Sequence, residues 1–206
     1  MKKLFFILIA LVAFNLSLSA QKDYKHVIKI NILPVMSEFS DYLSYVNFRT
    51  QFSVMHEFNT GKKHVPYLQL SYVGPMGYKY NIGYENSSED NNLNYSGFGI
   101  SAGSKTYLNE KHNGYYFAPQ ISFLRYINYK AESEDDFRTR VFDFTFSIIT
   151  GKQFVKNSGF TVDIYTGVGC SYKNYLDFIK DSDTDYSNYH GIGVRPYLGL
   201  MIGYSF

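Results

Sequence analysis

The last thirteen residues of the sequence, 194–206, alternate strictly between two kinds of position. In an extended strand, one face carries the apolar and aromatic residues Leu198, Leu200, Ile202, Tyr204 and Phe206. The opposite face carries Tyr197, Gly199, Met201, Gly203 and Ser205, most of which are small. The pattern predicts a β-strand with one apolar face. Two structures contain such a strand, a soluble β-sandwich and the wall of a membrane β-barrel.

Seven further segments alternate in the same way. The clearest of them is residues 45–58, in which Val46, Phe48 and Phe52 alternate with Asn47 and Gln51. One face of this strand therefore suits an apolar environment and the other a polar one. After residue 20 no run of eighteen apolar residues occurs, so a closed barrel is the only structure with which the mature chain could cross a bilayer. We therefore predict an all-β fold, an eight-stranded antiparallel up-and-down transmembrane β-barrel. Its strands are expected at residues 26–33, 45–58, 66–84, 95–108, 115–130, 140–153, 160–173 and 194–206.

The sequence begins with the features of a secretory signal peptide. Two lysines, Lys2 and Lys3, precede an apolar run over residues 4–16, and Ala20 is a suitable residue before the cleavage site. We predict a signal peptide at residues 1–20 and a barrel domain at residues 21–206. Cleavage would lower the formal charge from +2 to 0, which argues against a nucleic-acid partner. Cys170 is the only cysteine, so no internal disulfide can form, and we expect a buried, inert thiol.

The predicted connections alternate between short and long. Residues 59–64, 109–114 and 155–159 are short turns, whereas residues 35–43, 85–93, 131–138 and 174–190 are longer. The long segments contain thirteen acidic residues against two basic ones, Arg138 and Lys180. Outer-membrane barrels have short periplasmic turns and longer extracellular loops. The short turns are therefore expected in the periplasm and the acidic loops outside the cell. There the acidic residues either keep the exposed loops soluble, hold divalent cations or contact a cationic partner.

Across the whole mature chain, this arrangement resembles the small eight-stranded outer-membrane barrels of the OmpA transmembrane-domain and OmpX type. In that family, a terminal Phe preceded by alternate hydrophobic residues is recognised by the barrel assembly machinery. The resemblance therefore implies that Leu198, Leu200, Ile202, Tyr204 and Phe206 are the assembly signal. It also implies an outer-membrane location in a Gram-negative bacterium, with outer-membrane lipid and lipopolysaccharide as partners. No cofactor is implied, and the resemblance names no extracellular ligand.

The interior of such a barrel is narrow. Eight strands leave an interior that side chains can fill, whereas open aqueous channels need about sixteen, so general porin activity is not expected. Charged residues on the inward face must then be paired. We predict two ionic layers in the lumen, a lower one with Lys29, Glu57, Lys105 and Asp163 and an upper one with Arg49, Asp143 and Arg195.

The function expected from these features is non-enzymatic, either structural in the cell envelope or surface-binding. One alternative is a lipid A-modifying enzyme, for which Asp185, Ser187 and His190 are the only cluster of suitable residue types. A second alternative is a soluble periplasmic barrel that binds an apolar ligand. No paired-carboxylate site, phosphate-binding glycine loop or Cys/His metal spacing is present in the sequence, so no catalytic or metal site is predicted.

Overall fold

The computed structural model describes residues 25–32, 35–40, 45–60, 63–81, 92–108, 113–130, 137–179 and 185–206. The predicted signal peptide lies outside these residues. Within the part of the chain that is described, no helix is long and apolar enough to cross a membrane. The strands are β1 (His26–Asn31), β2 (Val35–Ser40), β3 (Tyr45–Phe58), β4 (His64–Asn81), β5 (Asn92–Tyr107), β6 (Gly114–Lys130), β7 (Phe137–Val155), β8 (Phe160–Ile179) and β9 (Asp185–Ser205).

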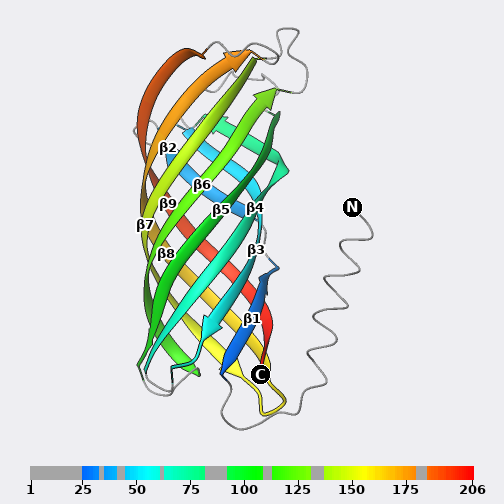
Figure 1. Cartoon of the computed structure of the whole chain (residues 1–206), viewed down its shortest axis with the longest axis vertical. Coiled ribbons are helices and arrows are strands. Elements are labelled where there is room, and N and C mark those ends of the chain that lie inside the picture. The colour runs from blue at the N-terminus through cyan, green and yellow to red at the C-terminus, as the bar shows by residue number, and fades with distance from the viewer. Residues whose placement is uncertain are drawn as a thin grey trace.

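These strands form one sheet that closes on itself. Each of β3 to β8 pairs antiparallel with the strand that follows it in sequence, and the ring closes because both β1 and β2 lie between β3 and β9. Val27, for example, pairs with Glu57 on one side and with Ser205 on the other. The strands tilt along the long axis of the molecule (Figure 1). The predicted all-β, eight-stranded antiparallel up-and-down barrel is confirmed, with β1 and β2 as two parts of one barrel strand.

The break between β1 and β2 is a one-residue irregularity. Ile30 pairs with Val54 and Val35 pairs with Thr50, so the first barrel strand has one residue more than β3 over this stretch, as in a β-bulge. We predicted a loop over residues 35–43 because Pro34 cannot donate to a ladder. That prediction was wrong for residues 35–40, because the backbones of β3 and β9 are available to pair with the chain after the proline.

The predicted loop at residues 174–190 was also largely wrong. β8 continues to Ile179 and β9 begins at Asp185, and the two remain paired over most of this length. The three short turns lie where expected, since β4, β6 and β8 begin at His64, Gly114 and Phe160. Two of these turns contain a glycine in the left-handed region, Gly114 with φ 106° and Gly159 with φ 87°. We call this end of the barrel the short-turn end and the opposite end the long-loop end.

The predicted alternation of faces is present in every strand whose side chains are described. Large apolar residues point outward and are exposed, with Phe98 and Leu198 each 71% exposed. Most buried side chains inside are polar or charged, among them Lys29, Glu57 and Arg195, whereas Arg125 and Lys152 point outward. Cys170 belongs to the outward set and is exposed in the isolated chain, so the expectation of a buried thiol was wrong. Its phase along β8, between inward Gly169 and Ser171, places it on the outer wall.

Candidate functional site: the charged barrel interior

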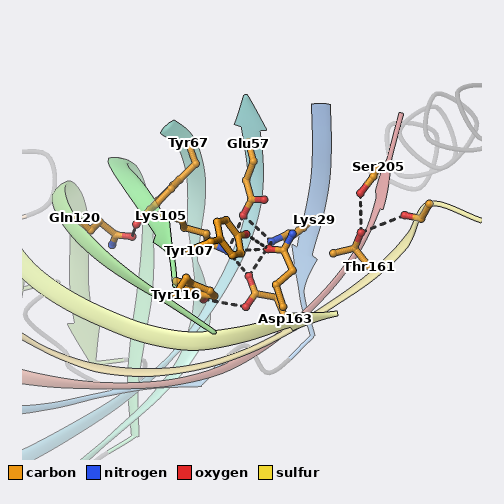
Figure 2. Close-up of polar contacts among 12 residues, drawn as sticks. Lys29, Glu57, Tyr67, Lys105, Tyr107, Tyr116, Gln120, Thr161, Asp163 and Ser205 are labelled. Carbon is orange, nitrogen blue, oxygen red and sulfur yellow. Dashed lines mark hydrogen bonds and ion pairs between the residues drawn. The ribbon is translucent and has the colours of Figure 1, made fainter. Parts of the chain in front are cut away.

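Four charged side chains meet inside the barrel near the short-turn end. Lys29 of β1 lies 2.6 Å from the Glu57 carboxylate of β3 and 2.8 Å from the Asp163 carboxylate of β8. Lys105 of β5 lies 2.6 Å from Glu57 and also contacts Asp163. Figure 2 shows the four side chains pointing toward one another from four separate strands. These are the residues of the expected lower layer, and all four are buried. We call them the ionic quartet.

The quartet alternates in charge, so each cation contacts two anions and each anion contacts two cations. Its net charge is therefore zero. Because burying an isolated charge is very costly, such a group persists only where partners and further hydrogen bonds replace the lost water. Neighbouring strands supply these bonds.

Three uncharged side chains surround the quartet and add hydrogen bonds to it. The Gln153 amide oxygen accepts from the Tyr107 hydroxyl at 2.7 Å, from Lys29, and from Lys105 at 3.3 Å. The Tyr116 hydroxyl donates to Asp163 at 2.9 Å, and the Lys105 ammonium lies 4.2 Å from the centroid of the Tyr116 ring. Sequence reasoning did not identify these three residues. The only signal was their inward phase, which does not reveal which inward residues meet across the barrel.

The expected upper layer is only partly described. Arg195 of β9 contacts Asp143 of β7 and donates to the Thr145 hydroxyl at 3.0 Å, and Thr145 in turn donates to Asp143 at 2.9 Å. Arg195 and Asp143 are both buried. The side chain of Arg49 lies outside the described residues. Lys173, which was not predicted as an interior charge, is also buried and pairs in register with Asp143.

A cavity of about 280 Å³ lies between the quartet and the Arg195–Asp143 pair, since its lining includes Lys105 and Asp163 from the former and Arg195 from the latter. The rest of its lining includes Gln51, Gln69, Gln120 and Ser101. The amide oxygen of Gln51 is buried and has no hydrogen-bond partner among the described residues. Apolar side chains also line it, among them Met55, Ala118, Leu124 and Ile149, so the cavity has both polar and apolar walls.

Toward the long-loop end, the interior contains an apolar cluster. Val73, Tyr95, Leu124, Tyr126 and Val141 form a buried cluster, and Tyr175 packs against it. In the sequence, the alternation of the strand predicted at residues 115–130, which is β6 in the structure, is unclear after Leu124. The structure continues the alternation there, but the chemistry of the two faces changes, with Leu124 and Tyr126 buried inside and Arg125 exposed outside.

The acidic residues were not all placed correctly. Asp177, predicted in an extracellular loop, is buried inside β8 and accepts a hydrogen bond from Thr139 at 2.8 Å. Glu38, also predicted in a loop, belongs to β2. Most of the other predicted loop acids lie outside the described residues, including Asp181 and Asp183, whose spacing resembles that of calcium ligands.

The C-terminal residues expected to form the assembly signal lie on the outward face of β9 and at its end. The Phe206 backbone is tied to the start of β1, since its N–H donates to the His26 carbonyl at 2.9 Å and its carbonyl accepts from the Lys25 and His26 N–H groups at 3.0 Å. Leu198 and Ile202 are exposed on the outer wall, and Leu200 is partly exposed. The segment thus joins the last strand to the first, and its apolar side chains point to the outside of the barrel.

The cluster suggested for an enzyme is only partly described. His190 lies in a strand rather than in an irregular loop, and its ring stacks on Tyr172 with centroids 5.6 Å apart. The side chains of Asp185 and Ser187 lie outside the described residues. Within the described part of the chain, no group of three or more His, Cys, Asp or Glu residues could hold a metal ion.

Comparisons with known proteins identify no family. No protein-family model matches the chain, and a search of curated proteins finds no match either.

Proposed function

We propose that this chain is a non-enzymatic integral outer-membrane β-barrel protein, exported by its signal peptide, with a structural or surface-binding role in the cell envelope. We also propose that the chain is similar to the OmpA transmembrane-domain and OmpX barrels and that its last strand is recognised during barrel assembly. The observation that carries it is the inverted distribution of side chains, with charges inside and large apolar groups outside.

Large apolar side chains are exposed on the outer wall around the barrel. Phe98, Leu198, Ile164 and Phe144 are each at least half exposed and come from β5, β9, β8 and β7. Soluble monomers rarely expose contiguous apolar patches larger than a few hundred Å². The four acidic residues with described side chains, Glu57, Asp143, Asp163 and Asp177, are all buried inside. Because hydrocarbon solvates apolar groups and excludes charge, a bilayer is the solvent that fits this surface.

The strands are also long enough to cross a membrane and extend beyond it. β6 to β9 have 17 to 21 residues, against about 9 to 11 for a tilted membrane-spanning strand. Outward aromatic residues lie at two levels on β6, with Tyr115 and Phe117 near the short-turn end and Phe123 farther along. Aromatic girdles of this kind mark the two interfaces of outer-membrane barrels. We place the short-turn end in the periplasm and the long-loop end outside the cell.

The interior argues for a closed barrel rather than a pore. Buried side chains occupy much of the interior, with the quartet toward the short-turn end and the apolar cluster toward the long-loop end. Apolar side chains, among them Met55, Ala118, Leu124 and Ile149, also line the cavity between the quartet and the Arg195–Asp143 pair, and they are the observation that favours the second candidate, a barrel that binds an apolar ligand inside.

Cell fractionation combined with heat-dependent gel mobility tests the proposal. We expect the chain in the outer-membrane fraction, and we expect unheated samples to migrate differently from boiled ones because the closed sheet resists detergent. Recovery in the soluble periplasmic fraction would contradict it. Mass spectrometry of lipid A from strains with and without the chain tests the enzymatic alternative, and an unchanged acyl pattern is the result expected here.

A further inference from the structure

The outer wall carries three arginines near the long-loop end, on the neighbouring strands β6 and β7. Arg125 is exposed on β6, and its phase between buried Leu124 and Tyr126 points it outward. On β7, Thr139 and Val141 point inward, so Arg138 and Arg140 share the outer face with Arg125. Arg125 pairs with Phe142 and Ile127 pairs with Arg140, which makes Arg125 and Arg140 diagonal neighbours about 7–8 Å apart.

Arg125 lies at the edge of the apolar surface. Its two cross-strand partners are Phe98 on β5 and Phe142 on β7. The guanidinium carbon is 5.6 Å from the centroid of the Phe142 ring, and the Phe123 ring lies on the same face with its centroid 6.5 Å from that of Phe142. Aromatic faces hold a guanidinium group in place while leaving its N–H donors available to other partners.

The height of Arg125 matches one face of a membrane. Along β6, ten residues separate it from Tyr115, the outward aromatic residue near the short-turn end. At about 3.3 Å per residue and a tilt of about 40°, this is roughly 25 Å along the barrel axis, the height of the apolar band of an outer-membrane barrel. Arg125 therefore lies where lipid headgroups begin.

The charge of this wall has one sign. No acidic side chain faces outward among those that the structure describes, because Glu57, Asp143, Asp163 and Asp177 all point inside. Arg138 and Arg140 also interact within the chain, so Arg125 is the principal contact and the other two add positive potential. Guanidinium groups bind phosphate by two parallel hydrogen bonds.

We propose that Arg125, Arg138 and Arg140 form a binding site for the phosphate groups of an acylated glycolipid of the outer leaflet, with the acyl chains against Phe98, Phe123 and Phe142. The proposal rests on the proposed membrane function and orientation. The position of the arginines at the long-loop end selects the outer-leaflet lipid over the phospholipid of the inner leaflet.

Lys152 provides a matched control at the other end of the same wall. It also points outward and stacks on aromatic rings, with its ammonium 4.6 Å from the centroid of Tyr115 and 4.9 Å from that of Phe154. Lys152→Gln therefore removes one positive charge from a similar aromatic setting at the short-turn end. If the lipid were held only by general electrostatic attraction, Arg125→Gln and Lys152→Gln would weaken its binding equally. If Arg125 belongs to a specific phosphate-binding site, only Arg125→Gln should weaken binding strongly.

The experiment is native mass spectrometry of the folded, full-length barrel in neutral detergent, titrated with diphosphoryl lipid A and, separately, with lipid A stripped of its phosphates. We expect the diphosphoryl form to bind more tightly. Arg125→Gln should weaken it about fivefold, and the triple variant R125Q/R138Q/R140Q on the order of 100-fold. Lys152→Gln should change it less than twofold.

Equal losses for Arg125→Gln and Lys152→Gln, or equal binding of the two lipids, would overturn the inference. Heat-dependent gel mobility of each variant verifies that the barrel is folded. If the triple variant does not fold, the comparison of Arg125→Gln with Lys152→Gln still tests the inference, because Arg125 is exposed. If the chain is recovered in the outer membrane but these variants bind normally, the inference alone fails. If the chain is soluble in the periplasm, the proposed function fails and the inference fails with it.

Discussion

At the scale of single residues, the interior charges stabilise the barrel only as a group. Lys29, Glu57, Lys105 and Asp163 contact one another in a closed ring of alternating sign, and Tyr116 and Gln153 satisfy further bonding positions. Removing one member of such a buried group leaves a charge uncompensated, which costs about 3–5 kcal/mol. The cost reflects the unpaired charge rather than the strength of any one bond.

We therefore expect Asp163→Asn and Lys105→Met each to destabilise the folded barrel by about 3–5 kcal/mol. The double variant leaves one cation paired with one anion, Lys29 with Glu57. Its loss of unfolding free energy should therefore be smaller than the sum of the two single losses by about 1–3 kcal/mol. Urea unfolding in detergent micelles measures this, followed by circular dichroism because the chain contains no Trp. Strictly additive losses would mean that the two side chains do not share one desolvated network.

At the scale of strand pairs, tyrosines and glycines fit together across the inner wall. Four inward tyrosines pair in register with inward glycines: Tyr67 with Gly103, Tyr116 with Gly151, Tyr126 with Gly97 and Tyr165 with Gly199. In each pair, a Cβ atom added to the glycine would lie within 3 Å of the tyrosine. The sequence predicts that glycines leave room in a narrow barrel. The structure adds that tyrosines of the neighbouring strand occupy this room, with the phenol group next to Gly103, Gly151 and Gly199.

Gly199 offers the cleanest test, because its three nearest atoms all belong to the Tyr165 side chain, at 2.1 to 2.4 Å from the added Cβ. Gly199→Ala should cost about 1–3 kcal/mol by overpacking, and very little in a Tyr165→Ala background. Gly203 on the same strand is the control. Its added Cβ would lie 2.1 Å from the Ile28 carbonyl oxygen, a backbone atom, so Tyr165→Ala should not relieve Gly203→Ala. The measurement is again the free energy of unfolding in micelles, and an unrelieved Gly199→Ala would contradict the pairing.

At the scale of the whole molecule, the sequence predicts what depends on local alternation. The eight barrel strands, their faces and the short turns follow from a period of two residues, because an apolar solvent outside and polar groups inside impose opposite chemistry on successive positions. The strands at residues 35–40 and 174–179 were missed because local signals there favour a loop. Pro34 interrupts the first strand, and Asn174 and Lys173 are both polar although they lie on opposite faces. Their pairing depends on distant strands.

The interior site was less accessible to sequence reasoning. Inward phase identified Lys29, Glu57, Lys105 and Asp163 as lumen charges, but the contacts of Gln153 and Tyr107 depend on which strands face each other across the barrel. Cys170 illustrates the opposite error. A general tendency of free cysteines to be buried was applied to a residue whose phase already placed it on the outer wall, beside Phe146 and Val194.

The exposed position of Cys170 allows a test of the proposed environment of the whole barrel. It lies on the outer wall between Phe146 and Val194, both exposed and apolar, so the proposed bilayer should cover its thiol with hydrocarbon. Because a water-soluble maleimide does not enter hydrocarbon, it should label this thiol very slowly in lipid vesicles. Labelling should become rapid once the chain is unfolded in urea. The control is Ser158→Cys in a Cys170→Ser background, since Ser158 is exposed in the turn between β7 and β8 and should react quickly in both states. If Cys170 in vesicles reacts as fast as this control, the outer wall is in contact with water and the barrel is not embedded in lipid.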